Sequence, residues 1–388
     1  MIRRQQLSVA LVLAVAWLAG AAAPALAQGW FDSYRTFSVY VENDALAKWQ
    51  DDTTDESFTQ GMRFTWQFAK WPEWAASTHN ALSLLSKLKP SRFERANDEC
   101  TPQRTRAAAG ACGVVSFGLG QTMYAPRDII TSDLQTTDQP FAGWLFATIG
   151  LNTRDGKWQS GTEFVVGVIG PASLARDTQS LAHWTWSQGS PKPAGWDHQL
   201  KSSVHAGLMQ TYAVHAFEFC VKGRTKCSGG SHEGRIVDFS PKAELIATTV
   251  MVRASGGALL RAGYRFPDTL GQRIPATASY ARTSGRGSWW FAAFAGYDWR
   301  AVGHNAFLSG SYADGGANGW RNVGQIEPRR GINEGSAGFT FGNNGFTVSV
   351  QGVSRSLEWD PVIAGQPQTN SRGRHNFLSV MFGLNSGS

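Results

Sequence analysis

The stretch from Thr36 to Phe68 holds two segments in which apolar and polar residues alternate. Three apolar residues share one side of residues 36–42 (TFSVYVE), and four share one side of residues 61–68 (GMRFTWQF). A period of two is that of a β-strand, whose successive side chains point to opposite faces. Each segment is long enough to cross a bilayer as a tilted strand, which takes roughly 9 to 11 residues. The stretch therefore predicts a pair of membrane-crossing strands.

The first 27 residues are typical of a secretory signal peptide. Arg3 and Arg4 precede an apolar run, and Ala25-Leu26-Ala27 offers a small-residue cleavage site before Gln28. No second long apolar run follows, so we expect no transmembrane helix. The modest positive charge is weak evidence for an anionic partner.

The composition of residues 28–388 favours an outer-membrane β-barrel over a secreted β-sandwich. The chain contains 22 Phe, 16 Trp, 8 Tyr and 43 Gly, and 17% of its residues are charged. Ordinary soluble proteins have about 25% charged residues. An aromatic-rich, charge-poor chain with alternating segments is what a barrel requires, because its outer face contacts lipid and its lumen is polar.

Twelve strands are predicted in all, and an even number places both chain ends on the periplasmic side. After the first two, the expected strands are 113–124, 139–151, 161–169, 200–219, 236–247, 250–264, 289–302, 331–341, 346–359 and 375–384. Residues 69–111 break the alternation and are expected to form a periplasmic excursion. Residues 172–186 lose the period of two, which indicates an extracellular loop helix.

Four cysteines occur as two local pairs, Cys100 with Cys112 and Cys220 with Cys227. Export to an oxidising compartment favours two short-loop disulfides, both on the periplasmic side by the strand count. Metal ligation is the alternative, but the chain has no Cys-x-x-Cys.

The same strand count brings six polar or Gly-rich segments to one rim of the barrel, the extracellular one. They are residues 43–44, 57–61, 124–127, 140–144, 170–183 and 196–200. In order along the chain, these segments resemble the motifs of the outer-membrane lipid A 3'-O-deacylase family. The matching motifs are Val41-Glu42-Asn43-Asp44, Thr54-Asp55-x-x-Phe58-Thr59-Gln60-Gly61, Gly120-Gln121-x-Met123-Tyr124-x-Pro126, Pro140-Phe141-Ala142-Gly143-Trp144, Gly167-x-x-Gly170-Pro171 with His183, and Gly195-Trp196-x-x-Gln199-Leu200.

Three positions depart from the family pattern. Gln60 stands where Asn is usual, Ala125 where Thr is usual, and Ser202-Ser203 where Asn-Glu is common. The last departure leaves a family carboxylate unaccounted for.

The resemblance implies a twelve-stranded barrel at the outer membrane with its site between the wall and an extracellular helix. The implied activity is Ca²⁺-dependent hydrolysis of the ester that attaches the 3'-acyloxyacyl group to lipid A. By position, His183 matches the catalytic histidine, and Asn43, Asp44 and Thr59 match residues around the scissile ester. Lipid A or lipopolysaccharide is the implied partner, and no nucleic acid is expected.

The residues themselves are compatible with this chemistry. Ester hydrolysis needs a base that works near neutral pH, such as an imidazole, and a positive group that stabilises the oxyanion. Asp44 and Asn43, with Thr59, offer the oxygen ligands that a hard cation prefers. Arg127 and Lys48 are candidates for contacts with lipid A phosphates.

Each of these residues also has a structural interpretation. His183 alone is typical of an exposed loop, Asn43-Asp44 of a turn at a strand end, and Thr59 of a strand. Asp51, Asp52 and Asp55 are more typical of a solvated acidic loop than of cation ligands.

Two other functions stay open at this point. A serine-dependent outer-membrane phospholipase would use Ser57 or Ser173 as its nucleophile, although the chain has no Gly-x-Ser-x-Gly. A non-enzymatic, porin-like barrel is the other, but it leaves a loop helix with a histidine unexplained.

Overall fold

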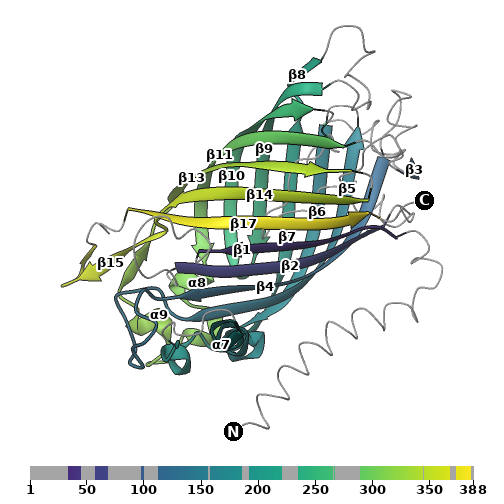
Figure 1. Cartoon of the computed structure of the whole chain (residues 1–388). Helices are drawn as coiled ribbons and strands as arrows, with labels where there is room; N and C mark the ends of the chain where they lie inside the picture. The colour runs from purple at the N-terminus through teal and green to yellow at the C-terminus, as the bar shows by residue number, and fades with distance from the viewer. Residues whose placement is uncertain are drawn as a thin grey trace.

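The computed structural model describes residues 34–44, 57–68, 98–99, 112–155, 158–185, 192–220, 235–264, 266, 289–343, 345–367 and 373–385. Twelve long strands form a closed antiparallel barrel, which confirms the predicted fold class (Figure 1). Pairing of β1 with β17 and of β9 with β10 completes the ring. The barrel strands are β1 (Tyr34–Asn43), β2 (Ser57–Phe68), β4 (Cys112–Ala125), β5 (Ala142–Asp155), β6 (Trp158–Ile169), β7 (Ser203–Val214), β9 (Arg235–Thr248), β10 (Met251–Tyr264), β11 (Trp290–Asn305), β13 (Gly331–Gly342), β14 (Phe346–Ser356) and β17 (Arg374–Asn385).

The remaining elements are short, apart from the helix α7 (Ala175–Thr185). They are β3 (Asp98–Glu99), η2 (Gly170–Ser173), η3 (Gly195–His198), β8 (Phe217–Cys220), α8 (Ala306–Ser309), η4 (Tyr312–Asp314), α9 (Trp320–Val323), β12 (Ile326–Pro328), β15 (Trp359–Ile363) and β16 (Gln366–Pro367). None of the described helices combines the length and apolar character that a membrane crossing requires. We call the end of the barrel at which β1 ends and α7 lies the α7 rim (Figure 1).

Two predicted strands are too long. The sixth was expected to run to Phe219, but β7 ends at Val214, which pairs with Trp158 at the start of β6. Beyond this point the chain has only β9 as a neighbour, so it continues separately as β8. The eleventh was expected to reach Trp359, but β14 ends at Ser356, and Trp359 begins β15, which pairs with β12 outside the barrel.

Ion pairs occupy the barrel lumen. Arg63 of β2 forms a salt bridge with Glu163 of β6, and its Nη2 donates to Thr148 Oγ1 at 3.0 Å. Further pairs inside the wall are Arg253–Glu244, Arg261–Asp238, Lys242–Asp298, Arg300–Glu334 and Arg355–Glu334. The inward positions of the alternating pattern therefore hold polar groups that pair with one another across strands.

Removing one partner of the buried Arg63–Glu163 pair is expected to destabilise the barrel. Glu163→Leu leaves a guanidinium in the lumen without its counter-charge, which costs about 3–5 kcal/mol in comparable buried pairs. The double variant Arg63→Met/Glu163→Leu is expected to recover most of this loss, because no unpaired charge remains. Urea unfolding in detergent measures the free energy of unfolding of both variants. Equal stability of the single and double variants would contradict the expected cost of the unpaired guanidinium.

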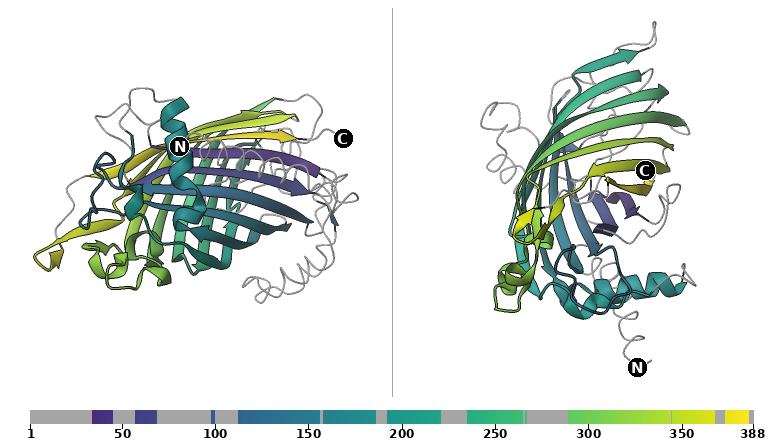
Figure 2. Two further views of the ribbon diagram at one scale, coloured as in Figure 1. Left: turned by 90° about the horizontal axis from the view of Figure 1, so that it is seen from below. Right: turned by 90° about the vertical axis from the view of Figure 1, so that its left-hand side faces the viewer.

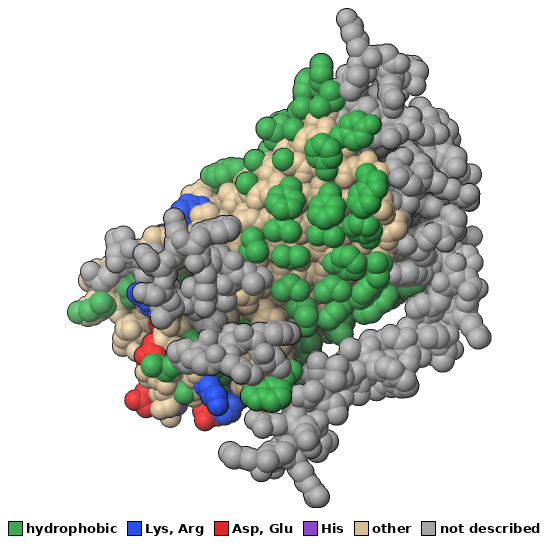
Figure 3. Space-filling view, in the orientation of Figure 1, with side chains coloured by type: hydrophobic (Ala, Val, Ile, Leu, Met, Phe, Trp, Pro, Cys, Tyr) green, Lys and Arg blue, Asp and Glu red, His purple; other side chains and the backbone are tan. Residues whose placement is uncertain are grey.

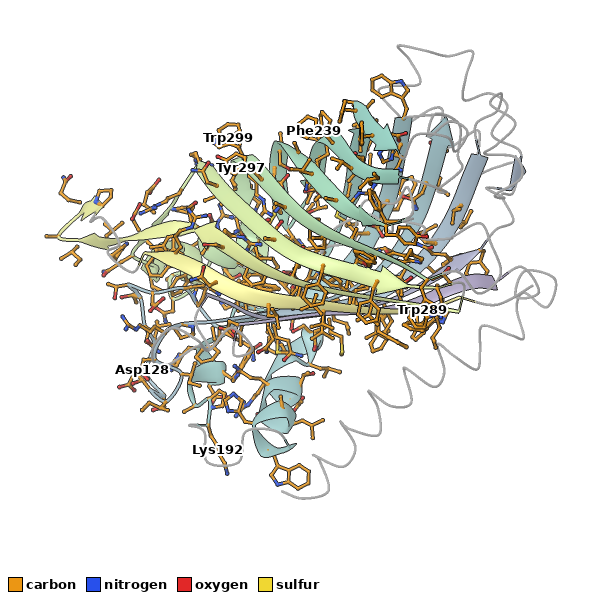
Figure 4. All side chains as sticks on the ribbon, turned by 45° about the horizontal axis from the view of Figure 1, so that its top comes forward. Asp128, Lys192, Phe239, Trp289, Tyr297 and Trp299 are labelled. Carbon is orange, nitrogen blue, oxygen red and sulfur yellow. The ribbon has the colours of Figure 1, made fainter. Side chains whose placement is uncertain are left out.

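The outer face of the barrel is apolar. In Figure 3, hydrophobic side chains (green) cover the wall that faces the viewer. Trp289, directly before β11, lies near one end of the barrel, whereas Tyr297 and Trp299 of β11 project outward nearer the other (Figure 4). Aromatic residues at both margins of an apolar band are typical of barrels that span a membrane.

The lumen is filled with apolar side chains at the α7 rim. Phe307 of α8 and Trp320 of α9 are buried against the inward-facing Tyr124 and Trp144. The rings of Phe307 and Tyr124 stack with their centroids 4.2 Å apart. The short helices between β11 and β13 thus place a hydrophobic plug inside the rim.

Candidate functional site

Three of the predicted site residues meet at the α7 rim, where β1 ends and β2 begins. Asn43 is opposite Gln60 in the register of the two strands. The backbone N–H of Asp44 donates to the carbonyl oxygen of Thr59 at 3.3 Å. Thr59 itself lies at a register shift between Phe58 and Gln60, which is a β-bulge on the side of β4. Such bulges are frequent next to active sites, because they redirect a side chain.

Two of these side chains are buried although they are polar. Asp44 and Thr59 are each 3% exposed. Within the described part of the chain, Thr59 Oγ1 is shielded from solvent and has no hydrogen-bond partner. Leaving a buried hydroxyl unsatisfied costs about 1–3 kcal/mol, so such a group calls for an explanation. A bound ligand that the hydroxyl contacts is one explanation.

The helix α7 packs on the outer face of β4 and β5. Ala175, in its first turn, is buried with Met123 and Phe141, and Gln121 Nε2 donates to the carbonyl oxygen of Ser173 at 2.6 Å. A Cβ atom on Gly143 would lie 2.2 Å from both Ala175 Cβ and Ser173 Oγ. Only glycine at position 143 therefore allows the helix to lie this close to the wall.

Gly143→Val is expected to displace α7 and to lower any activity that depends on it by about 100-fold, since misplacement by 1 Å can cost this much. The barrel should remain folded, which heat-modifiable mobility on gels checks. Gly352→Val is a matched control, because a Cβ atom there has no neighbour within 4 Å. Equal activity of the two variants would show that the close approach of α7 is unimportant.

A second loop supports the helix from the other side. Trp196 Nε1 donates to Gln179 Oε1 at 2.7 Å, and the Trp196 ring lies 4.9 Å from that of Phe141. The backbone N–H of Leu200 donates to the Phe141 carbonyl oxygen at 3.0 Å. The Phe141 and Gly195-Trp196 motifs thus hold α7 against the wall.

His183 lies in the last turn of α7 and is half-buried, with its Nδ1 shielded from solvent. Figure 2 shows α7 running crosswise to the strands, from β5 and β4 toward the side of β2 and β1. Gln60 is opposite Met123 of β4, and Met123 packs against Ala175 of α7. The end of β2 and the helix therefore adjoin the same outer surface, whereas the main contacts of α7 are with β4 and β5.

The other predicted residues lie elsewhere on the rim or outside the described residues. Arg127 is exposed at the same rim, and its backbone N–H donates to Asp138 Oδ2 at 3.3 Å. The signal peptide, Lys48, Asp51, Asp52, Asp55, Cys100, Cys227 and nearly all of residues 69–111 lie outside the described residues. The side chains of Ser57, Cys112 and Cys220 also do, so both disulfides stay predictions.

A cation site at the end of β1 would be built from oxygen atoms. In the described ranges, no three His, Cys, Asp or Glu side chains converge. Asp44 offers a buried carboxylate, Asn43 an amide oxygen, and Thr59 a buried hydroxyl without a partner. Ca²⁺ prefers such hard oxygen donors, so these three residues fit part of a calcium site.

Sequence reasoning missed two serine–histidine contacts. In the lumen far from α7, His215 Nδ1 is 3.0 Å from Ser240 Oγ and 3.7 Å from Asp238 Oδ2, and its Nε2 is 3.0 Å from Gln159 Nε2. A catalytic triad needs its acid and its serine on opposite ring nitrogens. Here both face Nδ1, so the arrangement is structural.

The second contact joins Ser203 and His205 of β7 near the α7 rim. His205 Nε2 is 2.8 Å from Ser203 Oγ, and its Nδ1 is 2.9 Å from Thr249 Oγ1. Ser203 Oγ donates to Ser311 Oγ at 3.1 Å, and Ser311 Oγ donates to Asp314 Oδ2 at 2.7 Å. The Ser203 proton therefore points away from His205, which is not placed to act as its base. Ser203 and His205 are two residues apart on one strand and therefore face the same side, which is the signal for this pair in the sequence.

A closed antiparallel barrel with a polar lumen, an apolar exterior and aromatic margins defines a β-barrel protein of the outer-membrane type. Comparison with protein families matches residues 9–377 to the family described as Outer membrane protein LpxR. The chain belongs to this family.

Among solved structures, LpxR from Salmonella typhimurium is similar to this chain. The two are 15% identical with a TM-score of 0.64, over 90% of this chain and 99% of the other. This likeness shows the fold alone. The β domain of the Bordetella autotransporter BrkA also matches, with 9% identity and a TM-score of 0.40 over 91% of this chain and 99% of its own. No curated protein sequence matches.

Proposed function

We propose that this outer membrane protein is an esterase that removes the 3'-O-linked acyloxyacyl group of lipid A, with its site at the extracellular rim. Support comes from membership of the LpxR family and from the ordered motifs that resemble the lipid A 3'-O-deacylases. The observation that carries the proposal is the junction of Asn43, Asp44 and the bulged Thr59. It combines a buried carboxylate with a buried hydroxyl that lacks a partner in the described chain.

In the proposed reaction, His183 accepts a proton from a water molecule as the water oxygen attacks the ester carbonyl carbon. The carbon–oxygen bond to the sugar then breaks, and the proton passes from His183 to the departing sugar oxygen. The products are a free acyloxyacyl acid and a 3'-hydroxyl group on lipid A. Asn43 and Thr59 orient the ester beside the imidazole through hydrogen bonds.

Asp44 and Asn43 are proposed to hold a divalent cation, with Ca²⁺ favoured by their oxygen donors. When bound, such a cation neutralises the negative charge that develops on the carbonyl oxygen. Burial of Asp44 strengthens this role, because electrostatic interactions are stronger away from water.

The position of α7 on the outer face of β4 and β5 suits a lipid substrate. Acyl chains embedded in the membrane reach the outer face of the barrel without leaving the bilayer. Arg127 is exposed at the same rim, where its guanidinium can contact a lipid A phosphate.

A serine-dependent phospholipase is less well supported. Ser173 is fully buried, and its Oγ donates to the carbonyl oxygen of Gly170 at 2.6 Å, so it helps to shape η2. The hydroxyl of Ser203 donates away from its neighbouring histidine. A porin-like function is disfavoured by Phe307 and Trp320, which fill the lumen at the α7 rim.

Purified protein incubated with lipid A in detergent tests the activity directly. Mass spectrometry is expected to detect a lipid A product that lacks the 3'-acyloxyacyl group, together with the free acid. Chelation with EDTA should stop the reaction, and added Ca²⁺ should restore it. Cleavage of phosphatidylethanolamine with lipid A untouched, or labelling by a fluorophosphonate probe with loss of activity, would favour the phospholipase instead.

A further inference from the structure

Three basic side chains gather at the α7 rim on another part of the barrel wall. His304 lies near the end of β11, Arg321 is on α9, and Arg330 directly precedes β13. Arg321 and Arg330 are exposed and His304 is half-exposed. Arg321 and Arg330 both lie close enough to His304 to interact with it electrostatically. We call these three residues the β11 basic cluster.

His304 and Arg330 lie on the outer side of the barrel wall. His304 is opposite Val252 of β10, which is 43% exposed, whereas the neighbouring pair of Val302 with Arg253 turns inward. The shift between these pairs redirects the end of β11. Arg330 Nη1 donates to the carbonyl oxygen of Val302 at 3.4 Å and to that of Gly303. These bonds fix the Arg330 guanidinium beside the outer edge of β11.

Within the described chain, no acidic side chain forms an ion pair with Arg321 or Arg330. Asp314 accepts hydrogen bonds from Ser311 and from the backbone of Lys201. Asp360 forms a salt bridge with Arg329 at 2.6 Å. Glu327 is exposed on β12 and forms no ion pair within the described chain. The guanidinium groups of Arg321 and Arg330 are therefore able to pair with an external anion.

Aromatic side chains lie directly next to the cluster on the membrane side. Trp299 is 50% exposed, and its Nε1 would lie 3.7 Å from a Cβ atom on Gly331, the residue after Arg330. Tyr297 is 54% exposed, and its hydroxyl donates to Asn333 Oδ1 at 2.6 Å. Figure 4 shows Tyr297 and Trp299 projecting from the outer wall. In Figure 3, basic side chains (blue) lie beyond the left edge of the apolar area.

We propose that the β11 basic cluster binds the phosphate of a lipid A molecule in the surrounding leaflet, with the sugar and upper acyl chains against Trp299 and Tyr297. Amphipathic aromatic rings lie at the head-group level of a membrane, and basic residues just beyond them attract anionic head groups. The cluster is four strands from β1 along the wall (β11, β13, β14, β17, β1). The bound lipid is thus distinct from a substrate at the candidate site, and the proposal rests on the proposed extracellular placement of the α7 rim but not on the esterase activity.

The test compares the binding of diphosphoryl lipid A to purified, delipidated barrels in detergent, all carrying His183→Ala so that no substrate is consumed. Arg321→Gln/Arg330→Gln is expected to weaken the binding of one lipid A molecule by about 30-fold. This estimate follows from about 1 kcal/mol for each basic residue near a head group. Native mass spectrometry at several lipid concentrations counts the bound molecules. Arg176→Gln/Lys192→Gln is the matched control, because it removes two exposed positive charges from the same rim.

Two further probes identify the ligand. Lipid A without phosphates and inorganic phosphate alone are each expected to compete poorly for the site. The site is proposed to contact both the phosphate and the sugar with its upper acyl chains. The proposal is overturned if the Arg321/Arg330 variant binds as much lipid A as the control does. It is also overturned if lipid A without phosphates binds as tightly as the diphosphoryl form. Either result can be obtained whether or not the protein proves to be an esterase.

Discussion

His183→Ala is expected to lower the rate of lipid A deacylation by about 10²–10⁴-fold, the usual contribution of a general base. Alanine leaves no group on α7 that can accept the proton of the attacking water. The helix itself should be retained, because it is held by Gln121, Ala175 and Gln179, and not by the imidazole alone. Single-turnover kinetics with the purified protein measure the effect.

The control for this variant is His198→Ala. His198 is exposed on η3, close to α7 in the fold, and has no role in the proposed reaction. We expect its rate to match that of the wild type. Full activity of His183→Ala would show that His183 is not the base of the reaction. Membership of the LpxR family would be unaffected, because it rests on the family match.

Asp44→Asn is expected to reduce the rate by about 10²–10³-fold, as the loss of one oxyanion-stabilising group does in other hydrolases. The substitution keeps the shape of the side chain and the backbone bond to Thr59, but it removes the charge that attracts a cation. The Ca²⁺ concentration for half-maximal activity should therefore rise as well. Titration of Ca²⁺ into the EDTA-treated variant and wild type measures both changes.

Asp128→Asn is the control for the loss of a carboxylate at this rim. Asp128 is exposed in the loop after β4 (Figure 4), where the hydrogen bond from Thr131 Oγ1 at 2.6 Å holds its pKa below the usual value. It is therefore ionised at neutral pH, as Asp44 is in the proposal. Equal losses in the two variants would point to a general effect of charge on lipid binding and against a cation at Asp44.

The barrel could be predicted from the sequence because alternation is a local property of each strand. The same reasoning placed Asn43, Asp44 and Thr59 together, because β1 and β2 are consecutive antiparallel strands and their register follows from the alternation. The position of α7 was also predictable, since residues 172–186 lose the period of two.

Features that depend on the closure of the barrel could not be predicted. Arg63 and Glu163 are 100 residues apart and meet only because of the stagger between β2, β4, β5 and β6. The helices that carry Phe307 and Trp320 have four residues each, too few to show a helical period. The contact of α7 with the wall depends on the missing Cβ atom of Gly143, and nothing in the local pattern distinguishes this glycine from the others.

The most direct test of the proposed function is the mass of lipid A from cells that produce the wild-type protein or His183→Ala at equal levels. If the esterase assignment is right, lipid A from wild-type cells loses the mass of a 3'-linked acyloxyacyl group, and lipid A from the variant cells keeps it. Identical lipid A from both strains, with both proteins folded in the outer membrane, would contradict it.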